Sequence, residues 1–267
     1  MVSSTFHARS AAAYEQFMGR WSRQLSKQFI EFTGASRGEK ILDVGCGTGS
    51  LSFALAEVAS VSAVIGVDLS DVYLEEANRV NRDARLVFQK GDATALQFGD
   101  ASFDRALSML VLQFVPNADL AVSEMRRVVR SGGVVAAAVW DSYGGVPAQR
   151  MLWDVAASLG LASSKNLSDY FFRPMTQPKA LAITWTRQGL LNVQQSSLTM
   201  RTDFVNFNDY WGPIAAGESS LGKFVTSLAA AEQERLKEGV RITFLGGQPD
   251  GARSFASTAW VCKGVVR

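Results

Sequence analysis

The sequence contains very little cysteine and histidine. Among 267 residues there are two cysteines, Cys46 and Cys262, and a single histidine, His7. Two cysteines so far apart indicate neither a disulfide framework nor a metal cluster, so we expect no metal site. His7 stands in a small, polar N-terminal stretch that we expect to be a loose tail. It is therefore a poor candidate for a general base.

Long apolar runs and blocks of one charge are also missing. No uninterrupted run of about 18 apolar residues occurs, and the first 13 residues offer no apolar stretch for a signal peptide. These absences predict a cytoplasmic, reduced protein without a membrane span. The 27 basic and 25 acidic residues form no dense basic block, which disfavours a nucleic-acid substrate. With 47% hydrophobic residues, the chain can bury a full core.

A glycine-rich stretch, residues 41–49, is the strongest motif present. Four mostly apolar residues run into a turn with glycine at three alternate positions, and a helical apolar pattern begins at Leu51. This order predicts a strand, a tight loop and a helix. Glycine accepts positive φ and has no Cβ, so a ligand can lie against the loop and the first amides of the helix. The spacing is G-x-G-x-G and differs from the G-x-G-x-x-G of dinucleotide-binding proteins.

With an acid at the strand end, the stretch resembles motif I of the class I S-adenosylmethionine-dependent methyltransferases. In that family the glycine loop wraps the methionine end of the cofactor. The resemblance implies S-adenosyl-L-methionine as the cofactor, with contacts from five residues of the motif: Asp43, Gly45, Cys46, Gly47 and Gly49.

A second acid follows the next apolar run. The run Val64 to Ser70 contains Asp68, 19 positions after Gly49. A carboxylate at the carboxyl end of the second parallel strand faces the same crevice as the loop after the first strand, and it can accept hydrogen bonds from both ribose hydroxyls. The alternative is that Asp68 caps the following helix, for which Ser70 is an equally good candidate. We expect Asp68 and Leu69 to contact the cofactor.

A third motif, Gly91-Asp92-Ala93, follows the third predicted strand, 84–89. It is similar to the adenine-binding acidic motif of the same family, in which the acid accepts from the adenine amine and the next amide faces the ring. The structural alternative is a plain turn. We expect Asp92 and Ala93 to bind the base, and Met109, at the end of the fourth strand, to complete the cofactor site.

The agent of proton abstraction is not evident. Where the family commonly has histidine pairs after the fourth strand, this sequence has Gln113 and Phe114. Asp141 directly follows the fifth strand, 134–140, but a surface-loop acid is the simpler interpretation. We therefore assign no catalytic residue. An acceptor that needs little base assistance, such as a carbon acid, a thiolate or a free amine, follows as a hypothesis.

Aromatic residues before and after the motifs are candidates for a substrate chamber. From Tyr14 to Phe29, apolar positions step by three and four, which predicts a helix ending before Thr33-Gly34. Such a stripe can simply pack on the sheet, but in the resembling family a leading helix often folds over the cleft. Helices are also expected at 146–159, 178–190, 204–216 and 221–236, and strands at 193–200 and 254–265. The candidate substrate residues are Tyr14, Trp21, Phe171, Phe172 and Trp211.

Together these patterns predict an α/β protein. We expect a Rossmann-like doubly wound sheet, mostly parallel with an antiparallel last strand, and helical additions over the carboxyl edge. Residues 1–33 would form a tail and cap helix, 34–140 the cofactor-binding core, and 141–267 the late strands with inserted helices as a substrate cap. The oligomeric state and the acceptor are not apparent from the sequence.

Three functions remain open at this point. The first is methyl transfer to a small-molecule acceptor, as in the type 11 and ubiquinone-biosynthesis-like methyltransferases, which the motifs of this sequence resemble. The second is a protein that binds S-adenosylmethionine without transferring the methyl group. The third is a nicotinamide-dependent oxidoreductase, which the glycine spacing and the Gly91-Asp92-Ala93 motif disfavour.

Overall fold

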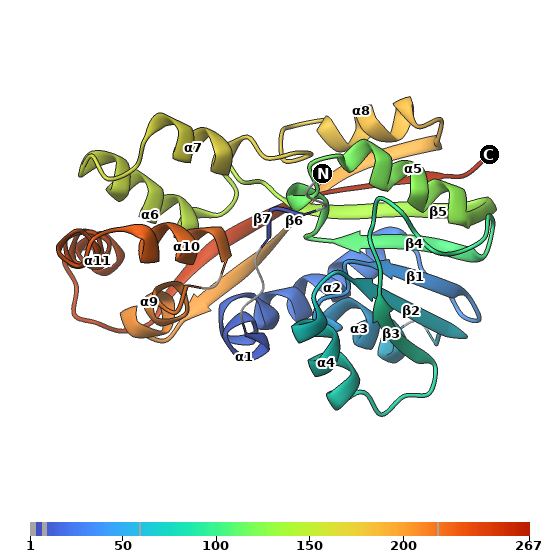
Figure 1. Ribbon diagram of the computed structural model, residues 1–267, viewed down its shortest axis with the longest axis horizontal. Helices are drawn as coiled ribbons and strands as arrows, with labels where there is room; N and C mark the ends of the chain where they lie inside the picture. Colours follow the sequence, from blue (N-terminus) through green and yellow to red (C-terminus); the bar gives the residue numbers. More distant parts are fainter. Residues whose placement is uncertain (1–3, 7–9, 59, 218) are drawn as a thin grey trace.

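A seven-stranded sheet forms the centre of the computed structural model, which describes residues 4–6, 10–58, 60–217 and 219–267 (Figure 1). The strand order is β3-β2-β1-β4-β5-β7-β6. The strands are β1 (Lys40–Val44), β2 (Ala63–Asp68), β3 (Leu86–Lys90), β4 (Phe103–Met109), β5 (Val129–Trp140), β6 (Leu191–Phe204) and β7 (Arg253–Val265).

Strand direction follows the sequence expectation. Strands β1 to β5 pair in parallel, with Ile41 beside Val64 of β2 and Leu42 beside Ala106 of β4. Strand β7 has the opposite direction and is antiparallel to both of its neighbours, β5 and β6. The predicted Rossmann-like sheet with an antiparallel last strand is therefore confirmed.

Helices cover both faces of the sheet (Figure 1). One buried cluster joins the sheet to α2, α3 and α4, and a second joins it to α5 and α8. No helix stands between β3 and β4; the described chain there forms a loop that adds Ala93 and Leu96 to the second cluster. The covering helices are α2 (Arg20–Thr33), α3 (Ser50–Val58), α4 (Asp71–Val80), α5 (Ala118–Val128) and α8 (Ala180–Arg187).

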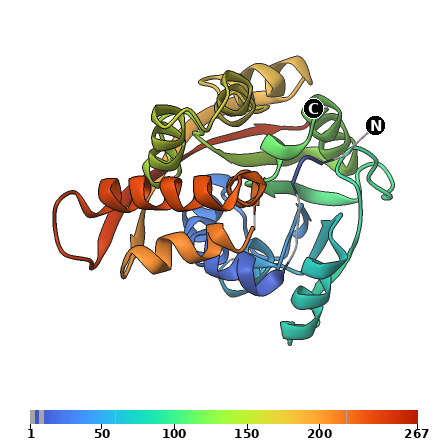
Figure 2. The same ribbon diagram turned by 60° about the vertical axis from the view of Figure 1, so that its left-hand side comes forward.

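The remaining helices gather beyond one end of the sheet, as Figure 2 shows from the side. They are α6 (Pro147–Ser158), α7 (Ser164–Phe171), α9 (Phe207–Ala215), α10 (Ser219–Ser227) and α11 (Ala230–Leu245). The last three come from one excursion between β6 and β7. Phe204 and Arg253, where this excursion leaves and returns, are directly paired in the sheet. Helical additions at this edge were predicted, and the described residues confirm them.

The leading helix is interrupted near the site. It begins as α1 (Ala11–Tyr14), continues through a π-helical turn (Glu15–Gly19) and then becomes α2. Gly34 ends it in a left-handed conformation with φ of 69°, as the Thr33-Gly34 signal predicts. The π turn was not predicted. Such turns widen the helix locally and are frequent at functional sites.

Two sequence expectations differ from the structure. The stretch 221–236, expected as one helix, belongs to two, because the chain breaks at Leu228-Ala229, where Glu232 Oε2 accepts from the Ala229 N–H at 2.9 Å. Strand β5 begins at Val129 instead of Val134, since the predicted glycine turn is a bulge inside the strand, with Gly132 at φ of 76°.

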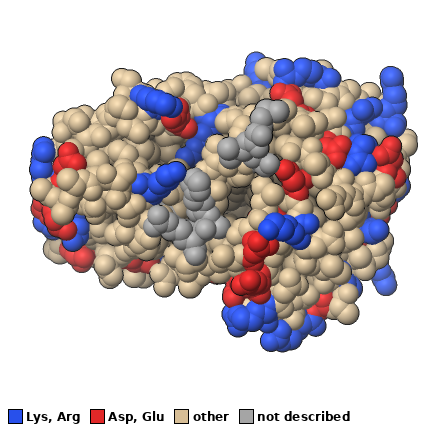
Figure 3. Space-filling model, in the orientation of Figure 1, with Lys and Arg blue, Asp and Glu red and all other residues tan. Residues whose placement is uncertain are grey.

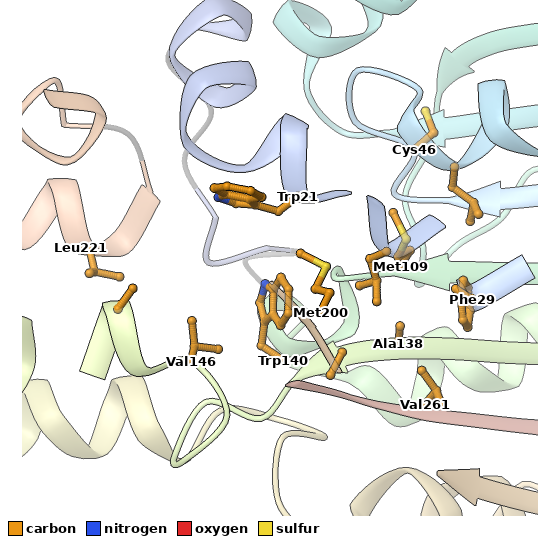
Figure 4. Close-up of a cluster of buried hydrophobic side chains, with 14 of the residues drawn as sticks. Trp21, Phe29, Cys46, Met109, Ala138, Trp140, Val146, Met200, Leu221 and Val261 are labelled. Atoms are coloured by element: carbon orange, nitrogen blue, oxygen red, sulfur yellow. The ribbon is translucent and has the colours of Figure 1, made fainter. Parts of the chain in front are cut away.

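The described helices include none that is both long enough and apolar enough to span a bilayer. Several of them, the leading helix included, pack around the buried cluster of Figure 4. Trp21 of α2, Trp140 of β5 and Met200 of β6 all belong to this cluster. It joins the leading helix to the late strands, and so it fixes the helix that covers the carboxyl edge of the sheet.

Candidate functional site

The three glycines of the loop have different structural roles. All three have positive φ, of 77° at Gly45, 54° at Gly47 and 93° at Gly49. A Cβ at Gly45 would lie 2.3 Å from the Val111 side chain, and one at Gly49 would lie 2.6 Å from Phe53. These two glycines permit close packing. A Cβ at Gly47 would meet only the Tyr14 hydroxyl, at 4.0 Å, so of the three glycines only Gly47 has open space where a Cβ would stand.

Asp68 is tied to the same loop. Its Oδ2 accepts from the Gly47 N–H at 2.9 Å, and its Oδ1 accepts from the Ser70 N–H at 2.9 Å. Burial raises the pKa of the Asp68 carboxyl. The residue that caps α4 is Ser70, whose hydroxyl accepts from the Tyr73 N–H. The capping alternative for Asp68 is therefore wrong.

Asp92 both forms a turn and faces the cavity. Its Oδ1 accepts from the Thr94 N–H at 2.8 Å and from the Thr94 hydroxyl at 2.7 Å. Gly91 allows the close approach to β2, since a Cβ there would lie 3.0 Å from Val67. The turn is therefore present, and it holds Asp92 and Ala93 against the cavity, while their contact with a base stays a prediction.

One cavity of 460 Å³ joins these motifs at the carboxyl ends of β1, β2 and β4 and the loop after β3. We call it the main cavity. Figure 3 shows the hollow near the centre of this face, with basic side chains on its left and both acidic and basic ones on its right. Of the predicted cofactor and substrate residues, those lining it are Gly45, Gly47, Asp68, Leu69, Asp92, Ala93, Met109 and Tyr14.

Aromatic rings form much of the cavity wall. The Phe6 ring lies 5.0 Å from Phe114 and 6.2 Å from Tyr73, and Tyr14 lies 4.9 Å from Tyr73, measured between centroids. The Thr5 N–H donates to the Phe114 carbonyl at 2.8 Å. Residues 4–6 of the expected loose tail are therefore docked over the cavity. A single phenylalanine in a polar stretch carries no sequence signal for this contact.

The leading helix is also bound to the loop. The Thr48 hydroxyl donates to Glu15 Oε1 at 2.6 Å, so the π turn is joined to the glycine loop. Tyr14, just before that turn, is partly buried, and burial raises the pKa of its phenol to about 12. The hydroxyl therefore stays protonated at neutral pH and can donate a hydrogen bond.

Three predicted cofactor residues do not line the main cavity: Asp43, Cys46 and Gly49. Asp43 is 1% exposed and accepts from the Ser52 hydroxyl at 2.7 Å, so it braces the strand end against α3. Burial raises the pKa of its carboxyl to about 7. Cys46 belongs to the buried core, and burial raises the pKa of its thiol well above the usual range. These residues support the loop from behind.

Four predicted substrate residues also lie elsewhere. Trp21, Phe171 and Trp211 are buried in the core cluster, because helical spacing of aromatics serves packing as well as a chamber. Phe172 is 59% exposed. It lines an adjoining open depression, here called the side hollow, which shares five residues with the main cavity: Phe6, Gln113, Phe114, Arg173 and Ser220.

The residues considered for proton abstraction have other partners. Gln113, where the resembling family often has histidine, is 2% exposed, and its Oε1 accepts from the Trp140 N–H at 2.8 Å. Asp141 accepts from the Gly144 N–H at 3.2 Å in the loop after β5. His7 lies outside the described residues. No three His, Cys, Asp or Glu side chains cluster for a metal ion in the described parts of the chain.

Two polar residues of the cavity, Arg173 and Gln149, were not predicted from the sequence. Arg173 lines both the main cavity and the side hollow. Its guanidinium lies 4.4 Å from the Tyr170 ring centroid and 5.0 Å from that of Phe114, and it donates to the Ser220 hydroxyl. Gln149 of α6 also lines the main cavity and accepts from the Tyr170 hydroxyl. These residues come from distant segments and form no local motif.

The region around the glycine loop matches a known protein family. The profile of the methyltransferase-domain family matches residues 42–137, which include the loop, Asp68, Asp92 and the fourth strand. Residues 42–137 of this chain therefore match a methyltransferase domain, over just over a third of its length. The cofactor that the three motifs imply is S-adenosyl-L-methionine.

Curated relatives of this methyltransferase domain act on different acceptors by name. Erythromycin 3''-O-methyltransferase of Saccharopolyspora erythraea is 36% identical over 120 residues, which cover 43% of this chain and 39% of the relative. Demethylmenaquinone methyltransferase of Staphylococcus aureus is 39% identical over 113 residues, covering 41% and 46%. The chain thus spans less than half the length of these curated relatives.

Solved structures resemble the methyltransferase domain and its additions in fold. The YcgJ protein of Bacillus subtilis has a TM-score of 0.61 at 18% identity, covering 93% of this chain and 99% of its own. Phosphoethanolamine N-methyltransferase 2 of Haemonchus contortus has a TM-score of 0.59 at 17% identity, covering 96% and 56%. At these identities the likeness concerns the fold alone.

Proposed function

We propose that this chain transfers the methyl group of S-adenosyl-L-methionine to a small-molecule acceptor. The observation that carries the proposal is the main cavity, where Gly47, Asp68 and Asp92 of three separate segments meet. The family match over residues 42–137 supports the same activity. Nothing in the charge distribution favours a nucleic-acid partner, and the cytoplasmic location stays a prediction.

The residues present fit this cofactor. Gly47 leaves open the space that a Cβ would fill, which suits the approach of an amino-acid tail to the loop. Asp68 is oriented by two backbone N–H groups, so its carboxylate is fixed where it can accept from ribose hydroxyls. Asp92 and Ala93 border the space for the base, and the rings of Phe6 and Phe114 provide an apolar wall beside it.

The cofactor supplies a methyl carbon that its sulfonium already makes electrophilic. The chain therefore has to orient an acceptor and exclude water. Positioning of this kind lowers a barrier by up to about 7 to 11 kcal/mol. Tyr14, Phe17 and Met18 of the leading helix cover the cavity on one side, while Gln149 of α6 and Leu221 of α10 border it on another.

These contacts support a separate role for each of three segments of the chain. We propose that residues 34–140 hold the cofactor, that 1–33 cover it, and that 141–267 complete the sheet and cap the acceptor. The acceptor-side residues would then be Tyr14, with Phe172 at the rim of the side hollow. No described side chain is assigned as a general base, so an acceptor that needs little base assistance remains the hypothesis.

Calorimetry and product analysis test the proposal. We expect S-adenosylmethionine and S-adenosylhomocysteine to bind, and NAD to give no heat. Incubation with candidate acceptors should release S-adenosylhomocysteine in proportion to methylated product. Absence of cofactor binding would refute the proposal. Binding without transfer to any acceptor would favour the non-catalytic alternative.

A further inference from the structure

Arg173 is a positive charge enclosed by aromatic rings at the junction of the main cavity and the side hollow. Phe114 and Tyr170 flank its guanidinium at 5.0 and 4.4 Å. Burial lowers the pKa of the guanidinium, but a guanidinium remains charged at neutral pH. The cavity thus contains a fixed cation as well as the acids of the sheet edge.

This cation has no carboxylate partner among the described residues. Among the described residues, the guanidinium contacts the two rings and the Ser220 hydroxyl, and its pKa is lowered by burial, against a smaller opposing effect of the Tyr170 phenol. Two other partly buried arginines are paired with carboxylates: Arg105 contacts Glu39 at 2.6 Å and Arg20 contacts Asp209 at 3.0 Å. Because a buried charge is costly without a counterion, Arg173 is suited to an anion brought by a ligand.

The first turn of α10 adds hydrogen-bond donors at the same place. Ser219, Ser220 and Leu221 all line the main cavity. The first amides of a helix have no acceptor within the helix, and its N-terminus carries partial positive charge. Ser219 is 6% exposed, and its hydroxyl has no hydrogen-bond partner in the described structure. The bond from Arg173 to Ser220 holds the guanidinium against this turn.

We propose that Arg173 and the first turn of α10 anchor an acid group, a carboxylate or a phosphate, of the methyl acceptor. This inference rests on the proposed function, since it names the acceptor class of the same site. A planar guanidinium binds either oxyacid through two parallel hydrogen bonds. The surrounding rings favour an acceptor with an apolar body next to its acid group.

The anchored group belongs to the acceptor and not to the cofactor. The side hollow, which Arg173 shares, is lined by Phe172, Trp153 and Lys223 and by none of the glycine-loop residues. Gly47, by contrast, is bordered by Tyr14. The guanidinium therefore stands where the main cavity meets the side hollow, which is lined by other residues than the glycine loop.

The test uses small aromatic probes on the full chain saturated with S-adenosylhomocysteine. Benzoate and phenyl phosphate are titrated calorimetrically beside benzamide, a neutral molecule of the same shape as benzoate. We expect at least one anion to bind about tenfold or more tightly than benzamide, because charge-assisted hydrogen bonds are lost in the amide. Comparison of the two anions tells carboxylate from phosphate.

Substitutions of Arg173 test whether this residue causes the preference for anions over benzamide. Arg173→Gln should lose it, whereas Arg173→Lys should keep part of it because the charge remains. Arg150→Gln is the matched control. Arg150 also lies over two rings, at 5.0 Å from Tyr143 and 4.7 Å from Phe171, but it does not line the main cavity. That variant should leave the preference unchanged.

Three results would overturn the inference. They are equal binding of benzamide and both anions to the parent chain, a preference that persists in Arg173→Gln, and a weakened affinity of Arg173→Gln for S-adenosylhomocysteine. The last would assign the guanidinium to the cofactor's own carboxylate. Failure of the parent chain to bind S-adenosylhomocysteine would instead refute the proposed function, and titrations without cofactor would then test the anion site alone.

Discussion

At the scale of single residues, substitution of Gly47 can distinguish the effect of filling the cavity from the effect of backbone strain. Gly47→Val should abolish detectable cofactor binding, because the new side chain enters the main cavity. The left-handed backbone also costs stability, on the order of 1 to 2 kcal/mol. Gly34→Val is the matched control, since Gly34 has φ of 69° and nothing within 4 Å of a Cβ. Comparable stability loss in both variants, with binding lost only in the first, is expected from calorimetry and urea denaturation.

Asp68 should contribute directly to cofactor affinity. Asp68→Ala removes charged hydrogen bonds and should weaken binding by about 2 to 3 kcal/mol, which corresponds to about 30- to 150-fold in Kd. Glu76→Ala is a control on α4, the helix that follows Asp68, where Glu76 pairs with Arg79 and does not line the main cavity. An unchanged Kd for Asp68→Ala in calorimetry would refute the assignment of the ribose site.

Asp43 should make stability depend on pH. Burial raises the pKa of its carboxyl to about 7, whereas an aspartate in an unfolded chain titrates near about 4. Between these values the folded protein holds a proton that the unfolded chain has lost, so the free energy of unfolding falls as pH rises through this window.

Asp43→Asn should remove that part of the slope while keeping an acceptor for Ser52. Urea denaturation of both proteins at about pH 5 and about pH 8 measures the difference. An equal decline in the two proteins would show that Asp43 is already ionised in the folded state.

At the scale of elements, an ion pair joins the leading helix to α9. Arg20 Nη1 contacts both carboxylate oxygens of Asp209, at 3.1 and 3.0 Å, and its Nε and Nη2 are buried without partners in the described structure. Asp209→Ala leaves that charge uncompensated. We expect a loss of about 1 to 3 kcal/mol and faster amide exchange in residues 11–19, measured by mass spectrometry.

Asp169→Ala is the control for this pair. Its partner is Lys165, and their side chains are 61% and 80% exposed, so the change should cost less than about 0.5 kcal/mol. Equal exchange in the leading helix of both variants would contradict a role for Arg20 and Asp209 in holding it.

Elements built from local patterns were predictable from the sequence. Strand β1, the glycine loop and the acid after β2 are each specified within a few residues, since turn chemistry and apolar runs act locally. The aromatic helices were less readable, because Trp21 and Trp211 have the spacing of either core or chamber residues and the structure buries both. Arg173 was missed because its partner Ser220 is 47 positions away.

At the scale of the whole molecule, cofactor binding should raise the unfolding temperature. A ligand at about 100 times its Kd stabilises the native state by about 2.7 kcal/mol, which for a chain of this size shifts Tm by about 5 to 10 °C. S-adenosylhomocysteine should produce this shift in differential scanning fluorimetry, and NAD should produce none. A shift of the same size with NAD would favour the oxidoreductase alternative.

The pairing of Phe204 with Arg253 means that 48 intervening residues, 205–252, depart from and rejoin the scaffold at one point. Insertions with adjoining ends leave the register of the host strands intact, so they can be exchanged as cassettes. Over evolutionary time, related proteins could thus acquire new acceptor preferences by replacing this cassette, while the proposed nucleoside-binding residues after β1, β2 and β3, at the same edge of the sheet, are inherited without change.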